Sequence, residues 1–112
     1  MLTIWGIETS KRNLPNKTLE MLVNNEFQLF KTHEDYKKYS LSFYDELKEL
    51  CKSVGLLCHK DEIGTTFIGL HPCDMEEDQT LREFKEKIKN KLKQIGFDNT
   101  EIDYYVDLDP GY

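Results

Sequence analysis

The sequence predicts a small domain of the α+β class, and three patterns lead to this prediction. Residues 102–108 alternate between apolar and polar side chains, as a half-buried strand does. Residues 81–95 instead repeat apolar side chains at helical spacing. Two further apolar runs lie on either side of residues 61–64, which have the character of a β-hairpin turn. Strands and helices therefore mix within a chain of 112 residues, the length of one ordinary domain.

The N-terminal part is predicted to hold one strand and one short helix. Residues 2–8 are rich in β-branched and aromatic side chains, which is typical of a strand. A loop over 9–16 follows, and its last residue, Asn16, is a good N-cap for a helix over 17–24. Residues 27–30 fit a strand and a helix equally well, because periodicity cannot separate the two over so few residues.

A second helix is predicted over residues 43–54. Ser42 is a suitable N-cap for it. Gly55 stands where a glycine in the left-handed conformation ends many helices. One face of this helix is apolar and should face the core: Phe43, Leu47, Leu50, Cys51 and Val54.

The predicted hairpin pairs residues 55–60 with residues 65–71, and its register places Cys58 opposite Phe67. Pro72 then ends the second strand, since proline lacks the N–H that a sheet requires. The chain continues through a short acidic loop.

The longest helix is predicted over residues 81–95. Thr80 and Glu83 fit the capping-box pattern at its start, and Gly96 stands where the helix should end. Its core-facing stripe is expected to consist of Leu81, Phe84, Ile88, Leu92 and Ile95.

The predicted element order is strand, helix, strand, strand, helix, strand, which is that of the ferredoxin-like fold, βαββαβ. In that fold the last strand lies beside the first, followed by the third and then the second, and the helices cover one face of an antiparallel sheet. Residues 9–40 exceed what this order requires, so we expect an extra element there. We predict one domain over residues 1–112.

The alternation of side chains along each strand predicts which face each residue occupies. Those expected to face the helices are Leu2, Ile4, Leu57, Ile68, Leu70, Ile102, Tyr104, Val106 and Leu108. Those expected on the open face are Thr3, Trp5, Ile7, Leu56, Cys58, Phe67, Gly69, His71, Asp103, Tyr105 and Asp107. We predict a partner-binding surface on the open face, formed by Trp5, Phe67, His71, Asp103, Tyr105 and Asp107.

Three interpretations of this open face compete. It is a second small core covered by residues 9–40 or by the tail, or it is a protein interface, including one between two copies of the chain. The third interpretation is an RNA platform, since aromatic side chains on central strands resemble those of RNA-recognition motifs. Asp103 and Asp107 argue against the third, because carboxylates repel phosphates.

The net charge of −6 is unevenly distributed along the chain. Residues 61–81 carry −6 and residues 94–112 carry −5, whereas residues 82–93 between them carry +4. Four cations share one side of the basic helix, which suits a solvated face or contacts with phosphates: Arg82, Lys85, Lys89 and Lys93. The flanking acidic segments cancel the long-range attraction for phosphates, so we expect no direct nucleic-acid binding.

All three cysteines and two of the three histidines fall within residues 51–73. Their spacing fits no zinc module, and strand geometry separates Cys58 from His71 by roughly 13 Å. A thiol enzyme built on His71 and Cys73 would need neighbouring side chains of an extended segment to meet. We therefore expect no metal, no cofactor and no enzymatic activity. The alternative is a small thiol or histidine enzyme, or a metal- or ligand-binding protein, that uses residues 71–74.

The sequence shows no apolar run of 18 residues and no N-terminal signal pattern, and its cysteine count is odd. We therefore expect a cytoplasmic location without membrane contact.

We predict a small acidic, non-enzymatic binding protein that inhibits or antagonises a partner protein with a basic surface. Immunity proteins and phage inhibitors of host defence are the class expected, because the chain is small and acidic, has an aromatic and acidic C-terminal strand and shows no catalytic grouping. A composition without alanine and rich in lysine, isoleucine and asparagine separately suggests an AT-rich bacterial or phage source. A homodimeric structural module is a further alternative.

Overall fold

Four strands and three α-helices make up the described part of the chain. The structure is a computed structural model that describes residues 2–10, 13–24, 40–61 and 63–108. Residues 27–30, which fit strand and helix equally well, lie outside these ranges. The elements in chain order are β1 (Leu2–Thr9), α1 (Asn16–Asn24), α3 (Ser40–Ser53), β2 (Leu57–Lys60), β3 (Thr66–Leu70), the 3-10 turn η2 (Pro72–Asp74), α4 (Leu81–Gln94) and β4 (Asp103–Leu108).

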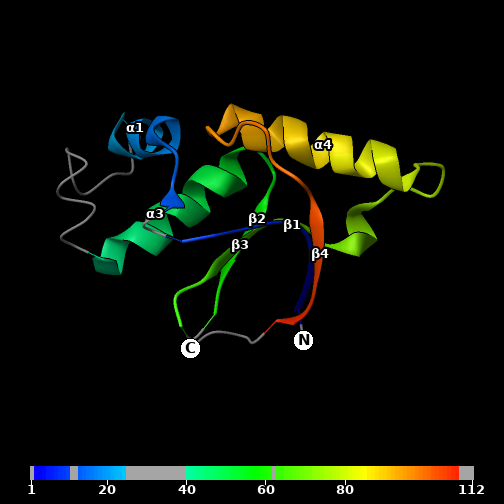
Figure 1. Cartoon of the computed structure of the whole chain (residues 1–112), viewed down its shortest axis with the longest axis horizontal. Coiled ribbons are helices and arrows are strands. Elements are labelled where there is room, and N and C mark those ends of the chain that lie inside the picture. Colours follow the sequence, from blue (N-terminus) through cyan, green and yellow to red (C-terminus); the bar gives the residue numbers. More distant parts are fainter. Residues whose placement is uncertain (1, 11–12, 25–39, 62, 109–112) are drawn as a thin grey trace.

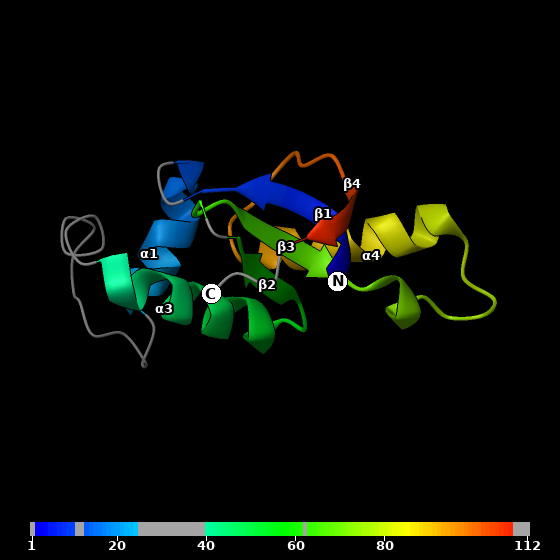
Figure 2. The ribbon, with the colours of Figure 1, turned by 90° about the horizontal axis from the view of Figure 1, so that it is seen from below.

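The strands form one antiparallel sheet in the order β2-β3-β1-β4, so the domain is of the mixed α+β kind. The last strand lies beside the first, followed by the third and the second, as predicted from the element order. Helices α3 and α4 lie on the same side of the sheet (Figure 1), and a view from below shows the strands in front of α4 (Figure 2). None of the described helices combines the length and the apolar character that crossing a bilayer requires.

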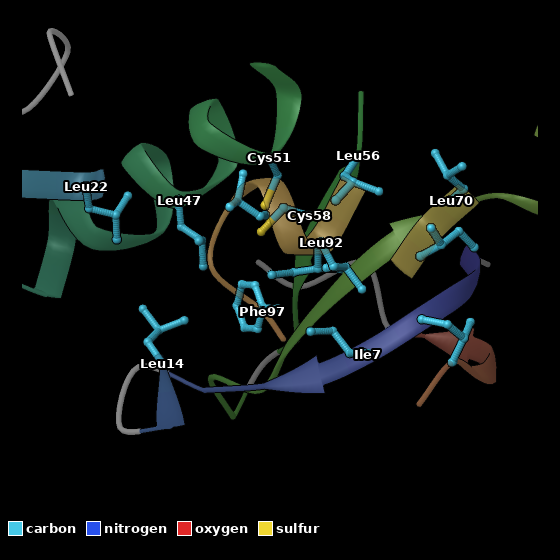
Figure 3. Packing of buried hydrophobic residues seen from close by; sticks show 14 of the residues in the cluster. Ile7, Leu14, Leu22, Leu47, Cys51, Leu56, Cys58, Leu70, Leu92 and Phe97 are labelled. Carbon is cyan, nitrogen blue, oxygen red and sulfur yellow. The ribbon is translucent and has the colours of Figure 1, made fainter. Parts of the chain in front are cut away.

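The core fills the space between the sheet and the helices, and Figure 3 shows part of its packing. Helix α4 contributes Phe84, Ile88 and Leu92, all fully buried, which confirms most of its predicted stripe. Leu81 is the exception, because its side chain is 42% exposed. It lies in the first turn of α4, which projects past the edge of the sheet (Figure 1).

The assignment of β1 side chains to the two faces was wrong. Trp5 and Ile7 pair with Leu70 and Ile68 of β3, and residues that pair directly share a face. Trp5 and Ile7 therefore point toward the helices, and Ile4 lies on the opposite face. The apolar residues of β1 occupy both faces, so the strand's own alternation does not decide between them; the pairing with β3 does.

The hairpin register was also wrong by one residue. Cys58 pairs with Ile68 rather than with Phe67, so Cys58 points toward the helices and Leu57 points away. Leu56, expected on the open face, is buried in the core ahead of β2. The loop is one residue longer than predicted, because the Asp61 carboxylate accepts hydrogen bonds from the backbone N–H groups of Ile63 and Thr65. A shift of one residue moves every side chain of β2 to the other face.

The capping box at the start of α4 is present as predicted. The Thr80 hydroxyl accepts a hydrogen bond from the Glu83 N–H at 3.2 Å, and the Glu83 carboxylate accepts one from the Thr80 N–H at 3.0 Å. We expect Thr80→Ala to lower the free energy of unfolding by about 1 kcal/mol, because the Glu83 N–H loses its acceptor and the Thr80 hydroxyl no longer donates to the Glu83 carboxylate. Urea unfolding measures this loss. Thr80→Ser is the matched control, and an equal loss in both variants would contradict the role of the cap.

Candidate binding site

The structure divides the six residues predicted to bind a partner. Phe67, Asp103 and Tyr105 lie on the sheet face opposite the helices, as predicted, whereas Trp5 lies on the helix side. His71 lies beyond β3, at the start of η2. The sixth residue, Asp107, belongs to β4, but its side chain is outside the described set. The six residues therefore do not form one surface.

Trp5 packs where the edge of the sheet meets α4. Its ring lies 4.4 Å from that of Tyr104, measured between centroids, and the Lys85 ammonium lies 5.1 Å from the centroid of the Trp5 ring. Tyr104 itself is 48% exposed. Lys85 of the basic stripe therefore lies over the tryptophan of this aromatic pair and stabilises it by a cation–π contact.

The centre of the opposite face is closed rather than bare. Ile4 is 0% exposed and Phe67 is 7% exposed, so neither offers a surface to a partner. Phe67 and Tyr105 come from the two strands that flank β1, yet their ring centroids lie only 5.1 Å apart. Gly6 of β1 pairs with Gly69 of β3 on this same face, and the missing side chains leave room for the two rings to meet.

A groove opens where β1 runs past the start of β4. Strand β3 pairs with β1 as far as Thr9, but β4 pairs with it only up to Gly6. The remaining length of β1 faces the connection between α4 and β4. The groove has a volume of about 330 Å³ and is lined by Ile7, Glu8, Thr9, Asn13, Phe97, Thr100, Glu101, Asp103 and Tyr105.

Among the described residues, the charged groups that line the groove are all negative. The lining includes the carboxylates of Glu8, Glu101 and Asp103, all three on exposed residues, and no lysine, arginine or histidine from the described part of the chain. These carboxylates come from the two ends of the chain and line the same groove because β1 and β4 are neighbours. Such a lining favours a cationic group over an anionic or neutral one.

The wall of the groove is held in place by contacts with α1. The Thr18 hydroxyl donates a hydrogen bond to the Ile95 carbonyl at 2.6 Å, and Lys17 forms an ion pair with Asp98 at 2.9 Å. Gly96 adopts a positive φ of 100° between these contacts, and a Cβ there would lie 2.5 Å from the Thr18 hydroxyl. Only glycine satisfies both conditions, so the connection leaves α4 in one direction.

Burial raises the pKa of the Tyr105 phenol above its ordinary value, and the negative charges of Asp103 and Glu8 raise it further. A hydrogen bond with the Glu8 backbone acts in the opposite direction. We expect Tyr105 to lose its proton at a higher pH than a free tyrosine, and Asp103→Asn to lower that pH. The ring ¹³C shift of Tyr105, followed from pH 8 to pH 12, measures both.

The raised pKa of Tyr105 also makes the stability of the folded protein depend on pH. Because the pKa is higher in the folded state, the folded protein holds this proton more tightly than the unfolded chain does. The resulting stabilisation is complete below the unfolded pKa, near 10, and is lost as the pH rises through the folded value. A Tyr105 titration indistinguishable from that of free tyrosine would contradict the described environment.

The segment 71–74, on which the alternative enzyme or ligand-binding protein would depend, consists of His71 and the 3-10 turn η2. Nδ1 of His71 accepts a hydrogen bond from the Cys73 N–H at 3.1 Å and so caps η2. That nitrogen is therefore not directed at the Cys73 thiol, whose residue is exposed. The other two cysteines, Cys51 and Cys58, lie together in the core (Figure 3). Their mutual hydrogen bond and their burial raise the pKa of the Cys51 thiol.

No group of three or more metal-ligating side chains converges on a point within the described ranges.

Comparison of the chain with protein-family models, with curated proteins and with solved structures gave no match. The site therefore has to be interpreted from its own geometry.

Most of the groove could not be predicted from local sequence patterns. Glu8, Thr9 and Glu101 were not singled out, because they lie in separate segments and form no motif. One signal was available: the predicted order already placed the first strand beside the last, and both carry acidic residues near the end where they part. Combining the predicted strand order with the positions of the acidic residues would have predicted that Glu8 lies close to Asp103.

Proposed function

We propose that this domain is a non-enzymatic protein-binding module that docks on a basic surface of a partner protein through the acidic groove. The observation that carries the proposal is the lining of the groove, in which Glu8, Glu101 and Asp103 are the charged residues that the structure describes. A partner whose basic surface performs its own function would be inhibited by such docking. Immunity proteins and phage inhibitors of host defence act in this way, and this class is part of the proposal.

The exposed aromatic edge beside the groove supports a protein partner. Tyr104 and Tyr105 are consecutive in β4, so one ring lies on each side of the sheet at its edge. Aromatic side chains surrounded by charged ones are typical of protein interfaces.

We also propose that the fold is a ferredoxin-like variant, which the strand order and the helices on one face support, and that α1 is the extra element within residues 9–40. The odd number of cysteines supports a reducing, cytoplasmic location.

The test reverses the charge of the groove. We expect Glu101→Lys combined with Asp103→Lys to weaken binding of the partner by about 100-fold or more, because like charges facing each other across an interface cost several kcal/mol. The wild-type domain is used to capture the partner from the source cell, and calorimetry with the purified partner then measures the dissociation constant of each variant.

A matched control carries the same change in net charge elsewhere. Glu20 and Glu49 are both exposed and lie on α1 and α3, away from the groove. Glu20→Lys combined with Glu49→Lys should leave the affinity within a few-fold of the wild type. An equal loss in the two double variants would show a general charge effect, and an unchanged affinity in the groove variant would overturn the proposed function.

A further inference from the structure

We propose that the acidic groove receives a single arginine side chain of the partner, whose guanidinium group is held between the carboxylates of Glu101 and Asp103 and the ring of Tyr105. This inference rests on the proposed function and specifies which chemical group the groove recognises. It is carried by three features: the size of the groove, a buried hydroxyl in its wall that has no hydrogen-bond partner among the described residues, and the combination of carboxylates with an aromatic ring.

The size of the groove limits its occupant. A volume of about 330 Å³ is at the lower end of the range for ligand pockets. One long side chain fits such a space, whereas a helix does not, since its diameter with side chains is about 10–12 Å. The groove is therefore suited to one anchoring residue within a larger contact.

The hydroxyl of Thr9 provides an independent indication of a polar ligand. Thr9 lines the groove and is only 7% exposed. Across the described residues, its hydroxyl forms no side-chain hydrogen bond. A buried hydroxyl without a partner costs free energy, and an N–H donor entering the groove would remove that cost. Thr9 pairs with Thr66 and shares the helix-facing side of β1 with Ile7, so it provides a neutral acceptor in the wall of the groove across from Asp103 and Tyr105.

The ring of Tyr105 favours arginine over lysine. Contact with Phe67 at 5.1 Å holds this ring in place, and the pairing of β4 with β1 sets Asp103 two residues before it on the same face. A guanidinium group is flat, stacks on aromatic rings and donates two parallel hydrogen bonds to a carboxylate. An ammonium group is compact and more strongly hydrated, so it gains less from the ring and from the forked geometry.

The experiment uses three short peptides as probes: acetyl-Gly-Arg-Gly-amide, its lysine analogue and its citrulline analogue. Citrulline keeps the shape of arginine but has no charge. Each peptide is titrated into the ¹⁵N-labelled full chain, and the amide shifts of Thr9, Glu101 and Asp103 report on the groove. We expect the arginine peptide to bind about fivefold more tightly than the lysine peptide, which corresponds to one additional charge-assisted hydrogen bond. The citrulline peptide should leave the shifts unchanged.

Two variants connect the signal to the groove. Thr9→Val keeps the shape of the side chain and removes its hydroxyl, and Asp103→Asn removes one charge. Each should weaken the arginine peptide about fivefold or more, whereas Glu49→Asn on α3 should not. The ¹⁵N spectrum of each variant shows whether the fold is retained.

Two sets of outcomes separate this inference from the proposed function. Equal binding of the arginine and lysine peptides, or binding of the citrulline peptide, would overturn the arginine assignment and leave a basic partner in place. The absence of any groove shift with the arginine peptide would overturn it as well. The proposed function fails separately, when the charge-reversed domain retains its affinity for the captured partner.

Discussion

Replacing Phe84 with alanine is expected to lower the free energy of unfolding by about 3–5 kcal/mol. Phe84 is the largest of the fully buried side chains, and it belongs to the central stripe of α4. Its removal both loses the transfer free energy of the ring and leaves a cavity that the neighbours fill only in part. Since a domain of this kind has a total stability of about 5–15 kcal/mol, this loss removes a large part of it, and the urea concentration at the midpoint of unfolding should fall accordingly.

Urea unfolding followed by circular dichroism measures this loss, and Leu81→Ala on the same helix is the control. Leu81 is the exposed member of the predicted stripe, so its truncation should change the stability by less than about 1 kcal/mol. Similar losses in the two variants would mean that α4 does not pack on the sheet through the Phe84 face.

Replacing Gly6 with alanine is the second change with a large expected effect. A Cβ at Gly6 would lie 1.9 Å from the carbonyl oxygen of Ile68, and a Cβ at its partner Gly69 would lie 2.0 Å from that of Trp5. The clashing atoms are backbone, so β1 and β3 would have to move apart. Overpacking typically costs about 1–3 kcal/mol, and we expect about 3 kcal/mol or more here, since no side chain can turn aside.

The control for this variant is Gly64→Ala in the hairpin loop. Gly64 has a positive φ of 91°, but no heavy atom lies within 4 Å of a Cβ placed there. Its substitution should therefore cost only the conformational strain, about 1–2 kcal/mol. A Gly6→Ala protein as stable as the Gly64→Ala protein would contradict the close approach of β1 and β3. A shifted Tyr105 ring resonance in Gly6→Ala would show that the disturbance reaches the open face.

Most of the element order could be predicted from local patterns. The capping box at Thr80, the glycines at positions 55 and 96, and the apolar spacing of the helices all act over one or two turns, and the structure contains each of them. The ends of the elements differ by a few residues from the prediction, most of all for α3, which begins at Ser40 rather than after Ser42.

The faces of β1 and β2 could not be predicted in this way. In the sequence of β4 the acidic residues stand only at odd-numbered positions, which share one face of the strand, so alternation alone assigned Asp103 and Tyr105 correctly. In β1 both faces of the strand carry large apolar residues, with Ile4 on one face and Trp5 and Ile7 on the other. In β2 the error arose from one extra loop residue. The predicted binding surface differs from the groove because Trp5 lies on the helix side, Phe67 is buried and His71 lies beyond β3.

Local sequence determined where the helices and strands form, because caps, glycines and apolar spacing act on neighbouring residues. It also determined that acidic charge is concentrated near the C-terminus. The tertiary structure alone decided that Glu8 joins Glu101 and Asp103, since strand pairing brings residues more than 90 positions apart into one groove. It also decided that Trp5 lies beneath Lys85 instead of on the open face, because β1 takes its register from β3.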